Sequence, residues 1–236
     1  FKKAYQGGYA IGAFNVNNMQ IAQGITRAAK TLNAPVILQC SAGARKYASH
    51  DYLVAMVKAA AEETGLPIAL HLDHGPDFQT VMLALRTGFT SIMRDASKLP
   101  YEQNVAEVRK VVEACHAIGV PVEAEIGKIG GAEEHVVVSE REALMSDPQE
   151  CVRFTEDAGF DFLAVAIGNA HGFYQGEPQL DFERLEAIRS LVPVPLVLHG
   201  ASGIPDHQIT MAVERGICKI NIDTEVRYAL VTTMKA

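Results

Sequence analysis

The sequence predicts a protein of the α/β class, a (β/α)8 or TIM barrel. Short apolar runs rich in β-branched residues alternate with longer amphipathic segments, and this happens eight times within 236 residues. Glycines follow the amphipathic segments and prolines open the apolar runs, which is typical of helix ends and strand starts. No linker or low-complexity stretch interrupts the pattern, so we expect residues 1–236 to form a single domain.

The predicted strands share apolar, β-branched character and a length of four to seven residues: YAIGAF (9–14), PVILQ (35–39), PIALHL (67–72), TSIM (90–93), PVEAE (121–125), DFLAVAI (161–167), PLVL (195–198) and ICKINI (217–222). Between them, segments 19–32 and 105–119 show helical spacing of apolar residues. The predicted helix ends are Gly65, Gly88, Gly119, Gly159 and Gly216, and the strand-opening prolines are Pro35, Pro67, Pro121 and Pro195. A doubly wound open sheet is the alternative, but the glycine-rich phosphate loop usual after its first strand is absent from the sequence.

Charge and composition exclude several classes of partner. Lys and Arg number 21 and Asp and Glu number 28, which gives a net charge of −7, and no basic tract occurs. We therefore expect neither nucleic-acid nor membrane binding, and no apolar run is long enough to cross a bilayer. The four cysteines are widely spaced, which indicates reduced thiols and a cytoplasmic location. The chain begins with Phe1 rather than Met, so we expect its extreme N-terminus to be missing.

Three histidines follow three of the predicted strands, and each stands directly before a glycine. His74 follows the third strand in HLDHG, His171 the sixth in AIGNAHG and His199 the seventh in LVLHG. Active sites of barrels form at the carboxyl ends of their strands, so the three imidazoles should converge there and bind a metal such as Zn²⁺. For any one of them, a hydrogen-bonded packing histidine is the alternative.

Asp73 stands beside His74 and, by strand alternation, should point to the other side of the chain. A carboxylate next to a catalytic metal is a candidate acid–base group, although it could instead orient a ligand histidine. His71 lies on the same side of the strand as Asp73 and is expected to fill the barrel interior.

Further carboxylates stand at the ends of the fourth and fifth strands: Asp95 follows the fourth, and Glu123 and Glu125 end the fifth. Asp95, Glu123 and Glu125 could bind a second cation or pair with Lys128 or Arg94. The longest irregular stretch, 127–147, is typical of a functional loop or lid. It carries Glu133 and Glu134, which the residue pattern alone assigns to solvated loop charges.

The seventh and eighth strands are followed by HGASG (199–203) and NIDTE (221–225). Barrels commonly bind phosphate at these two loops through backbone amides and helix N-termini. Composition, periodicity and spacing therefore indicate a barrel enzyme with a divalent metal and a phosphorylated substrate, and leave its reaction open.

Motifs along the whole chain resemble those of one family. They are GAFNVNN (12–18), PVILQCSAGA (35–44), HLDHG (71–75), FTSIMRDAS (89–97), EAEIGKIGG (123–131), LAVAIGNAHGFYQGEP (163–178), PLVLHGASGIPD (195–206) and KINIDTE (219–225). In this order and combination the sequence resembles the class II, metal-dependent ketose-bisphosphate aldolases, which act on fructose or tagatose bisphosphate. The resemblance implies a zinc-dependent lyase whose single TIM-barrel catalytic domain cleaves fructose 1,6-bisphosphate to dihydroxyacetone phosphate and glyceraldehyde 3-phosphate through a zinc-stabilised enediolate.

The resemblance also implies roles for individual residues. His74, His171 and His199 match the ligands of the catalytic Zn²⁺, Asp73 the acid–base group at the substrate C4 hydroxyl, and Glu133 the loop carboxylate that moves a proton on dihydroxyacetone phosphate. The implied substrate-binding and phosphate-binding residues are Asn15, Ser41, Gly172, Gly200, Ala201, Ser202, Asn221, Ile222, Asp223 and Thr224, where a monovalent cation often assists. Asp95 and Glu125 match a second, non-catalytic metal position.

The sequence departs from the family's pattern at two residues beside the second metal position. These are Arg94 and Lys98, which replace residues usual in the family. From the resemblance we expect a homodimer or homotetramer, and we expect that the family's C-terminal helical extension is not part of this sequence. The alternatives are a tagatose-bisphosphate or other ketose-phosphate aldolase, a different metal-dependent barrel enzyme and a non-catalytic partner subunit. A lysine Schiff base could replace the metal, but Lys219, inside the last strand, is assigned to structure.

Overall fold

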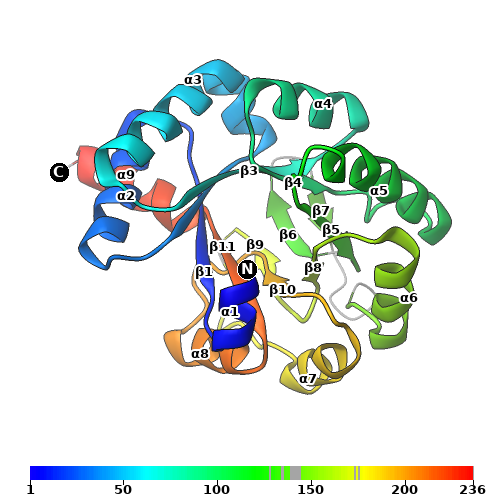
Figure 1. Cartoon of the computed structure of the whole chain (residues 1–236). Helices are drawn as coiled ribbons and strands as arrows, with labels where there is room; N and C mark the ends of the chain where they lie inside the picture. The colour runs from blue at the N-terminus through cyan, green and yellow to red at the C-terminus, as the bar shows by residue number, and fades with distance from the viewer. Residues whose placement is uncertain (128, 134–135, 139–144, 173, 175, 236) are drawn as a thin grey trace.

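The computed structural model describes residues 1–127, 129–133, 136–138, 145–172, 174 and 176–235. Within these residues, eight parallel strands close into a barrel in the order β1-β11-β10-β8-β5-β4-β3-β2, with helices around the outside (Figure 1). The predicted (β/α)8 TIM barrel is confirmed.

The barrel strands agree with the eight predicted runs. They are β1 (Ile11–Asn15), β2 (Val36–Cys40), β3 (Ile68–Gly75), β4 (Ser91–Arg94), β5 (Val122–Ile126), β8 (Phe162–Val165), β10 (Leu196–Leu198) and β11 (Ile217–Ile222). The largest difference is in β3, which continues beyond the predicted end to Gly75. The four strand-opening prolines lie immediately before β2, β3, β5 and β10, where the missing amide hydrogen removes no hydrogen bond between strands.

The described helices are α1 (Lys2–Gly7), α2 (Met19–Thr31), α3 (Ala42–Thr64), α4 (Phe78–Thr87), α5 (Tyr101–His116), α6 (Pro148–Ala158), α7 (Phe182–Leu191), α8 (Asp206–Glu214) and α9 (Thr224–Lys235). Side-chain oxygens of Asn18, Asp77 and Asp147 accept the orphan amides at the starts of α2, α4 and α6. Gly65, Gly88 and Gly159 end helices in the left-handed conformation, as predicted. Gly119 and Gly216 also have positive φ, but they follow the C-caps of α5 and α8 instead of forming them. None of the described helices is long and apolar enough to cross a membrane.

The stretch 127–147, predicted to be irregular, contains a β-hairpin. Strands β6 (Gly130–Glu133) and β7 (Val136–Val138) pair antiparallel, and β6 also pairs with the short strand β9 (Ala170–His171). These strands give little signal in the sequence, because each has only two to four residues and β6 begins with two glycines. Lys128 and Glu134 lie outside the described residues.

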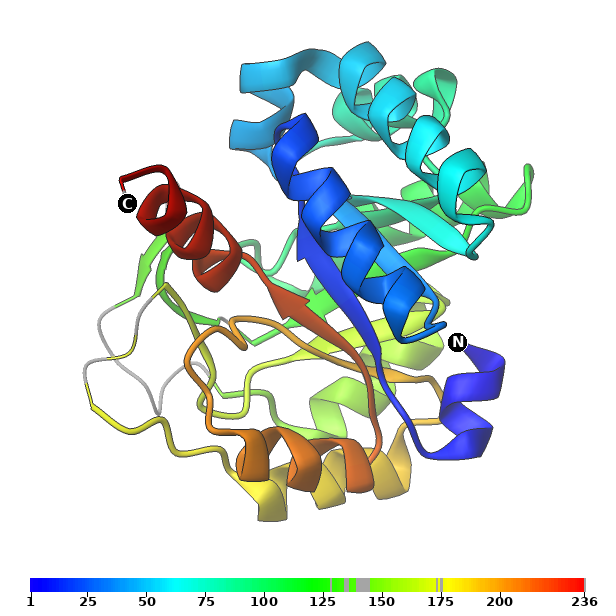
Figure 2. The ribbon, with the colours of Figure 1, turned by 90° about the vertical axis from the view of Figure 1, so that its left-hand side faces the viewer.

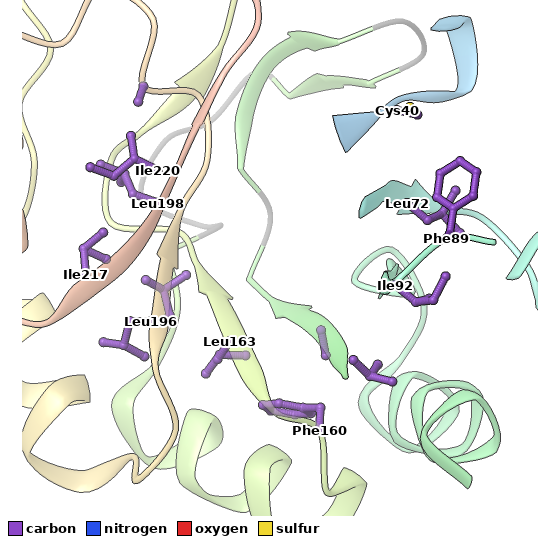
Figure 3. Packing of buried hydrophobic residues seen from close by; sticks show 14 of the residues in the cluster. Cys40, Leu72, Phe89, Ile92, Phe160, Leu163, Leu196, Leu198, Ile217 and Ile220 are labelled. Atoms are coloured by element: carbon purple, nitrogen blue, oxygen red, sulfur yellow. The ribbon is translucent and has the colours of Figure 1, made fainter. Parts of the chain in front are cut away.

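The main hydrophobic core lies between the barrel and its helices. Figure 3 shows part of it, with Leu163 on β8 beside Leu196 on β10. A smaller apolar cluster is formed by Met93, Phe162, Ala164 and Val197, and the Phe1 ring packs on Phe162 with centroids 4.4 Å apart. Helix α1 therefore covers the amino ends of the strands, at the opposite side of the molecule from α9 (Figure 2).

Next to this apolar cluster, the barrel interior becomes polar. Gln39, His71, Glu123 and Lys219 are all at most 1% exposed, and they come from four different strands. Lys219 Nζ lies 2.8 Å from Glu123 Oε2, so the buried charges are paired. The predicted interior position of His71 and the structural assignment of Lys219 agree with this arrangement. The change from apolar to polar side chains marks the approach to the carboxyl ends of the strands.

Candidate metal centre and active site

Three histidines come together at the carboxyl end of the barrel: His74 near the end of β3, His171 in β9 after β8, and His199 directly after β10. Ring nitrogens of His74, His171 and His199 lie within 4.8 Å of one another, and the ring centroids are 4.9–5.8 Å apart. His74 Nε2 is 3.1 Å from His199 Nδ1. The structure thus brings together the side chains that the sequence singled out.

A backbone irregularity turns His74 toward this cluster. The pairing of β3 with β4 shifts register between Leu72 and Gly75, and His74 has a φ of 46°, in the left-handed region. Bulges of this kind redirect a side chain at the end of a strand. Strict alternation would have placed Asp73 and His74 on opposite sides, yet both line one pocket, with Asp73 Oδ1 4.0 Å from His74 Nε2. The expectation from alternation was therefore wrong at this position.

Charges around the cluster set the protonation of its imidazoles. Burial lowers the pKa of His171 and of His199 well below the usual range, and the nearby His74 lowers them further. Burial also disfavours the charged form of His74, but Asp73, Asp95 and Glu125 together outweigh it and raise its pKa well above the usual value. One positive charge is therefore favoured at the centre of the cluster even without an ion.

This arrangement fits a divalent metal. Asp95 Oδ2 lies 2.8 Å from His74 Nδ1 and accepts a hydrogen bond from it. This contact leaves the other ring nitrogen, Nε2, directed at the cluster. Two nitrogens on a tetrahedral zinc ion are about 3.3 Å apart, close to the 3.1 Å between His74 Nε2 and His199 Nδ1. Three imidazoles from the protein would leave a position open for substrate.

Asp73 is held at the edge of the pocket by a chain of amides. Gln39 Nε2 donates to Asn15 Oδ1 at 2.5 Å, and Asn15 Nδ2 donates to Asp73 Oδ2 at 3.0 Å. Burial favours the neutral acid, but the charges of His74, His199 and Lys219 and the bond from Asn15 lower the pKa of Asp73. Asp73 Oδ1 has no hydrogen-bond partner among the described residues, which leaves one oxygen of an ionised carboxylate facing the pocket. Gln39 was missed by sequence analysis because an amide inside a strand carries no signal of its own.

A second group of possible ligands adjoins the first. His74, Asp95 and Glu125 each offer one atom within 4.8 Å of the others. Burial and then the charge of Asp95 raise the pKa of Glu125 well above its usual value, and Glu125 Oε2 has no hydrogen-bond partner among the described residues. Among the described residues, Arg94 forms no ion pair with these carboxylates: its guanidinium binds Glu107 at 2.9 Å and donates to the backbone carbonyls of Gly75, at 3.3 Å, and of Asp95. Lys98 is exposed.

The two predicted phosphate loops border the same pocket. Of the residues expected to bind substrate, those lining it are Asn15, Gly172, Gly200, Ser202, Asn221, Asp223 and Thr224. Ser41, Ala201 and Ile222 are not among the lining residues. Ser41 caps α3 by accepting from Ala44 N, and the Ala201 amide donates to the Asn221 carbonyl.

Close contacts join the segment carrying His171 to the segment carrying His199. The Tyr174 hydroxyl accepts from Ala170 N and donates to the Gly200 carbonyl, both at 2.8 Å. Gly200 has a φ of 61°, and a Cβ there would lie 2.2 Å from the Ala170 carbonyl oxygen. Sequence analysis did not identify Tyr174, although it falls within one of the motifs quoted above.

Glu133 ends strand β6, which runs beside the segment that carries His171, since Gly131 pairs with His171 itself. The backbone of the candidate base is thus two residues from a direct neighbour of the histidine cluster. The position of its side chain is not among the features that the structure describes.

Comparisons with known proteins agree on one family. A family model described as "Fructose-bisphosphate aldolase class-II" matches residues 1–236. A fructose-bisphosphate aldolase of Thermus caldophilus is 46% identical over 257 residues, covering 99% of this chain and 84% of that protein. Among solved structures, the YdjI aldolase of Escherichia coli K12 is similar with a TM-score of 0.87 and 37% identity, and a putative fructose-1,6-biphosphate aldolase of Coccidioides immitis with 0.90 and 34%. Each of these alignments covers 99% of this chain and 83% of the other.

Proposed function

The chain belongs to the class II fructose-bisphosphate aldolase family, and from that premise we propose that the three-histidine cluster and Asp73 together carry out the reversible cleavage of fructose 1,6-bisphosphate. The products are dihydroxyacetone phosphate and glyceraldehyde 3-phosphate. The observation that supports these residue roles best is the convergence of His74, His171 and His199 on one point beside Asp73.

The class II family implies a divalent metal, and the donor set described above suits Zn²⁺. Bound by the three histidines, the ion would act as a Lewis acid that stabilises the negative charge left on the triose fragment when the carbon–carbon bond breaks.

The protein's own side chains would handle the protons. In cleavage, ionised Asp73 takes the proton of the C4 hydroxyl, C4 becomes the aldehyde carbon, and the electrons of the C3–C4 bond remain on the dihydroxyacetone phosphate fragment. The lowered pKa of Asp73 supports this role, because a base has to be ionised before it can accept a proton. Glu133 would then deliver a proton to C3 of that fragment, and in the synthetic direction both transfers reverse.

The loops at 200–202 and 221–224 would hold a phosphate group together with Gly172, which lines the same pocket. Positive-φ glycines at 172 and 200 support this role, because they let backbone groups approach a ligand closely. Ser41, Ala201 and Ile222 would act in the second layer around the substrate or through their backbones.

Further features stay predictions. They are a second divalent cation at Asp95 and Glu125, a monovalent cation at the phosphate loops, a homodimer or homotetramer, and a cytoplasmic location, for which the four free cysteines are the support. Tagatose 1,6-bisphosphate, which differs only at C4, is the alternative substrate, since Asp73 would meet its C4 hydroxyl as well.

The test is a cleavage assay with fructose and tagatose 1,6-bisphosphates, before and after EDTA treatment and after Zn²⁺ is restored. We expect cleavage that EDTA abolishes and Zn²⁺ restores, with fructose bisphosphate the better substrate. Preference for tagatose bisphosphate would reassign the substrate and keep the mechanism. Activity that survives complete metal removal would exclude the mechanism.

A further inference from the structure

Behind the metal centre, the barrel interior holds a buried ion pair that also touches a candidate ligand. Glu123 on β5 and Lys219 on β11 are both 0% exposed. Each Glu123 oxygen has its own partner, because Oε2 lies 2.8 Å from Lys219 Nζ and Oε1 lies 2.7 Å from His199 Nε2. The carboxylate thus links a lysine in the barrel interior to an imidazole at the barrel mouth.

These contacts determine which nitrogen of His199 carries the proton. An ionised carboxylate accepts hydrogen bonds and cannot donate them, so the ring proton of a neutral His199 has to be on Nε2. The other nitrogen, Nδ1, then presents its lone pair, and Nδ1 is the atom that lies 3.1 Å from His74 Nε2 in the cluster. The opposite tautomer would place a proton between His199 and the ion.

Lys219 supplies the counter-charge that a carboxylate buried at position 123 requires, with its Nζ 2.8 Å from Glu123 Oε2. A buried carboxylate is costly without a counter-charge. His71, whose Nε2 is 3.5 Å from Glu123 Oε2, does not supply it, because burial and then the charge of Lys219 hold its pKa well below the usual range. The second ring nitrogen of His71 is satisfied by Ser91 Oγ at 2.8 Å. The ammonium of Lys219 therefore neutralises the carboxylate.

We propose that Glu123, held by Lys219, is a positioning residue that fixes the Nε2–H tautomer of His199 and so makes Nδ1 its metal-binding atom. The inference rests on the proposed function, because it takes the three-histidine cluster to be the metal site. It assigns Lys219 to the support of a ligand, since its amine is bound to the carboxylate and Lys219 is not among the residues that line the pocket.

Two double variants test whether Glu123 and Lys219 orient His199 or only pack in the barrel interior. Glu123→Gln with Lys219→Met removes both charges but keeps a carbonyl oxygen that can accept from His199 Nε2. Glu123→Leu with Lys219→Met removes the same charges and the acceptor. Zn²⁺ affinity would be measured by competition with a chromophoric chelator, and circular dichroism would verify that each variant is folded.

We expect the Leu variant to bind Zn²⁺ about 10- to 100-fold more weakly than the Gln variant, the range usual when the partner of a ligand histidine is lost. Equal affinities in the two folded variants would overturn the proposal. Asp161→Asn is the control, because Asp161 makes the same kind of contact, 2.8 Å, with the exposed His116 far from the cluster. It should leave Zn²⁺ affinity unchanged.

A second measurement uses the wild-type zinc enzyme and does not depend on the variants. Nitrogen-15 NMR of histidine-labelled protein reports which ring nitrogen of His199 carries a proton. A proton on Nε2 and zinc on Nδ1 would support the proposal, and the reverse would overturn it while leaving the proposed function intact. Failure of the wild-type protein to bind Zn²⁺ through its histidines would overturn both.

Discussion

Asp73 is the residue whose surroundings are most specific to proton transfer. Asn15 fixes one of its oxygens, and the other has no hydrogen-bond partner among the described residues although it is buried. An unsatisfied buried acceptor costs free energy, so its retention at the edge of a pocket indicates that a ligand group completes it. In the proposed reaction that group is the C4 hydroxyl of the substrate.

Replacing this carboxylate should separate turnover from metal binding. Asp73→Asn keeps the size of the side chain but cannot accept the C4 proton, so we expect turnover to fall by about 10²-fold or more with the metal content retained. Steady-state kinetics and metal analysis on the same preparation measure both quantities. Asp77→Asn is a suitable control, because asparagine caps a helix as well as the aspartate that now begins α4. Turnover at the wild-type level in Asp73→Asn would exclude the acid–base role.

At the scale of elements, the three histidines depend on how the ends of neighbouring strands pack. The segment after β10 lies so close to β9 that only a glycine fits at position 200. The Tyr174 hydroxyl bridges the same two segments. Geometry at the metal should therefore be sensitive to changes that never touch a ligand.

Gly200→Ala tests this close contact. Its methyl group would collide with the Ala170 carbonyl and strain a positive φ, so we expect a loss of about 3 kcal/mol or more in the free energy of unfolding and weaker Zn²⁺ binding. Gly119→Ala is the matched control, because it has a φ of 73° but no neighbour within 4 Å. The control should lose only about 1 kcal/mol and bind Zn²⁺ normally. Similar behaviour of the two variants in denaturation and metal titration would refute the packing argument.

The barrel strands and the positions of the three histidines could be predicted from the sequence, whereas features that depend on strand pairing could not. All eight barrel strands were predictable, because each buried run is long enough for its β-branched residues to stand out between glycine and proline signals. The places of His74, His171 and His199 followed from the strand ends. The bulge that turns His74 was not predictable, since it depends on the pairing of β3 with β4. The ion pair of Glu123 and Lys219 was missed for a similar reason, because β5 and β11 face each other only once the barrel is closed.

At the scale of the whole molecule, the barrel combines an apolar shell with a charged interior. The helices and the outer faces of the strands form one continuous hydrophobic cluster. Inside, at the carboxyl ends of the strands, paired charges and neutral histidines replace the branched apolar side chains usual in barrels. Such an interior makes the stability of the metal-free protein depend on pH.

Acid should destabilise the metal-free protein before its carboxylates titrate. Burial holds the pKa values of His71, His171 and His199 well below 6.5, so as the pH falls below 6.5 the unfolded chain takes up protons on these three histidines that the folded chain does not bind. Their contribution to stability is present above pH 6.5 and is lost as the pH falls. Glu125 acts in the opposite direction, because burial raises its pKa well above 4.5 and the folded chain keeps one proton that the unfolded chain has released. His74 adds nothing below pH 6.5, where both states are protonated.

The free energy of unfolding should therefore fall as the pH is lowered below 6.5, with a positive slope against pH, because three histidines act in this direction and one carboxyl acts against them. Urea denaturation of the metal-free protein between pH 5 and 7 measures this slope. A free energy of unfolding that stays constant or rises on acidification across this range would show that the buried histidines are not held neutral.

In the proposed reaction, one metal ion held by His74, His171 and His199 is required for aldol cleavage. The most direct measurement is a titration of the metal-free protein with Zn²⁺ while the cleavage of fructose 1,6-bisphosphate is followed. We predict no activity at the start, a linear rise up to one equivalent of Zn²⁺ per chain, and no further increase. Full activity before any metal is added, with the substrate trapped on a lysine by borohydride, would contradict the account.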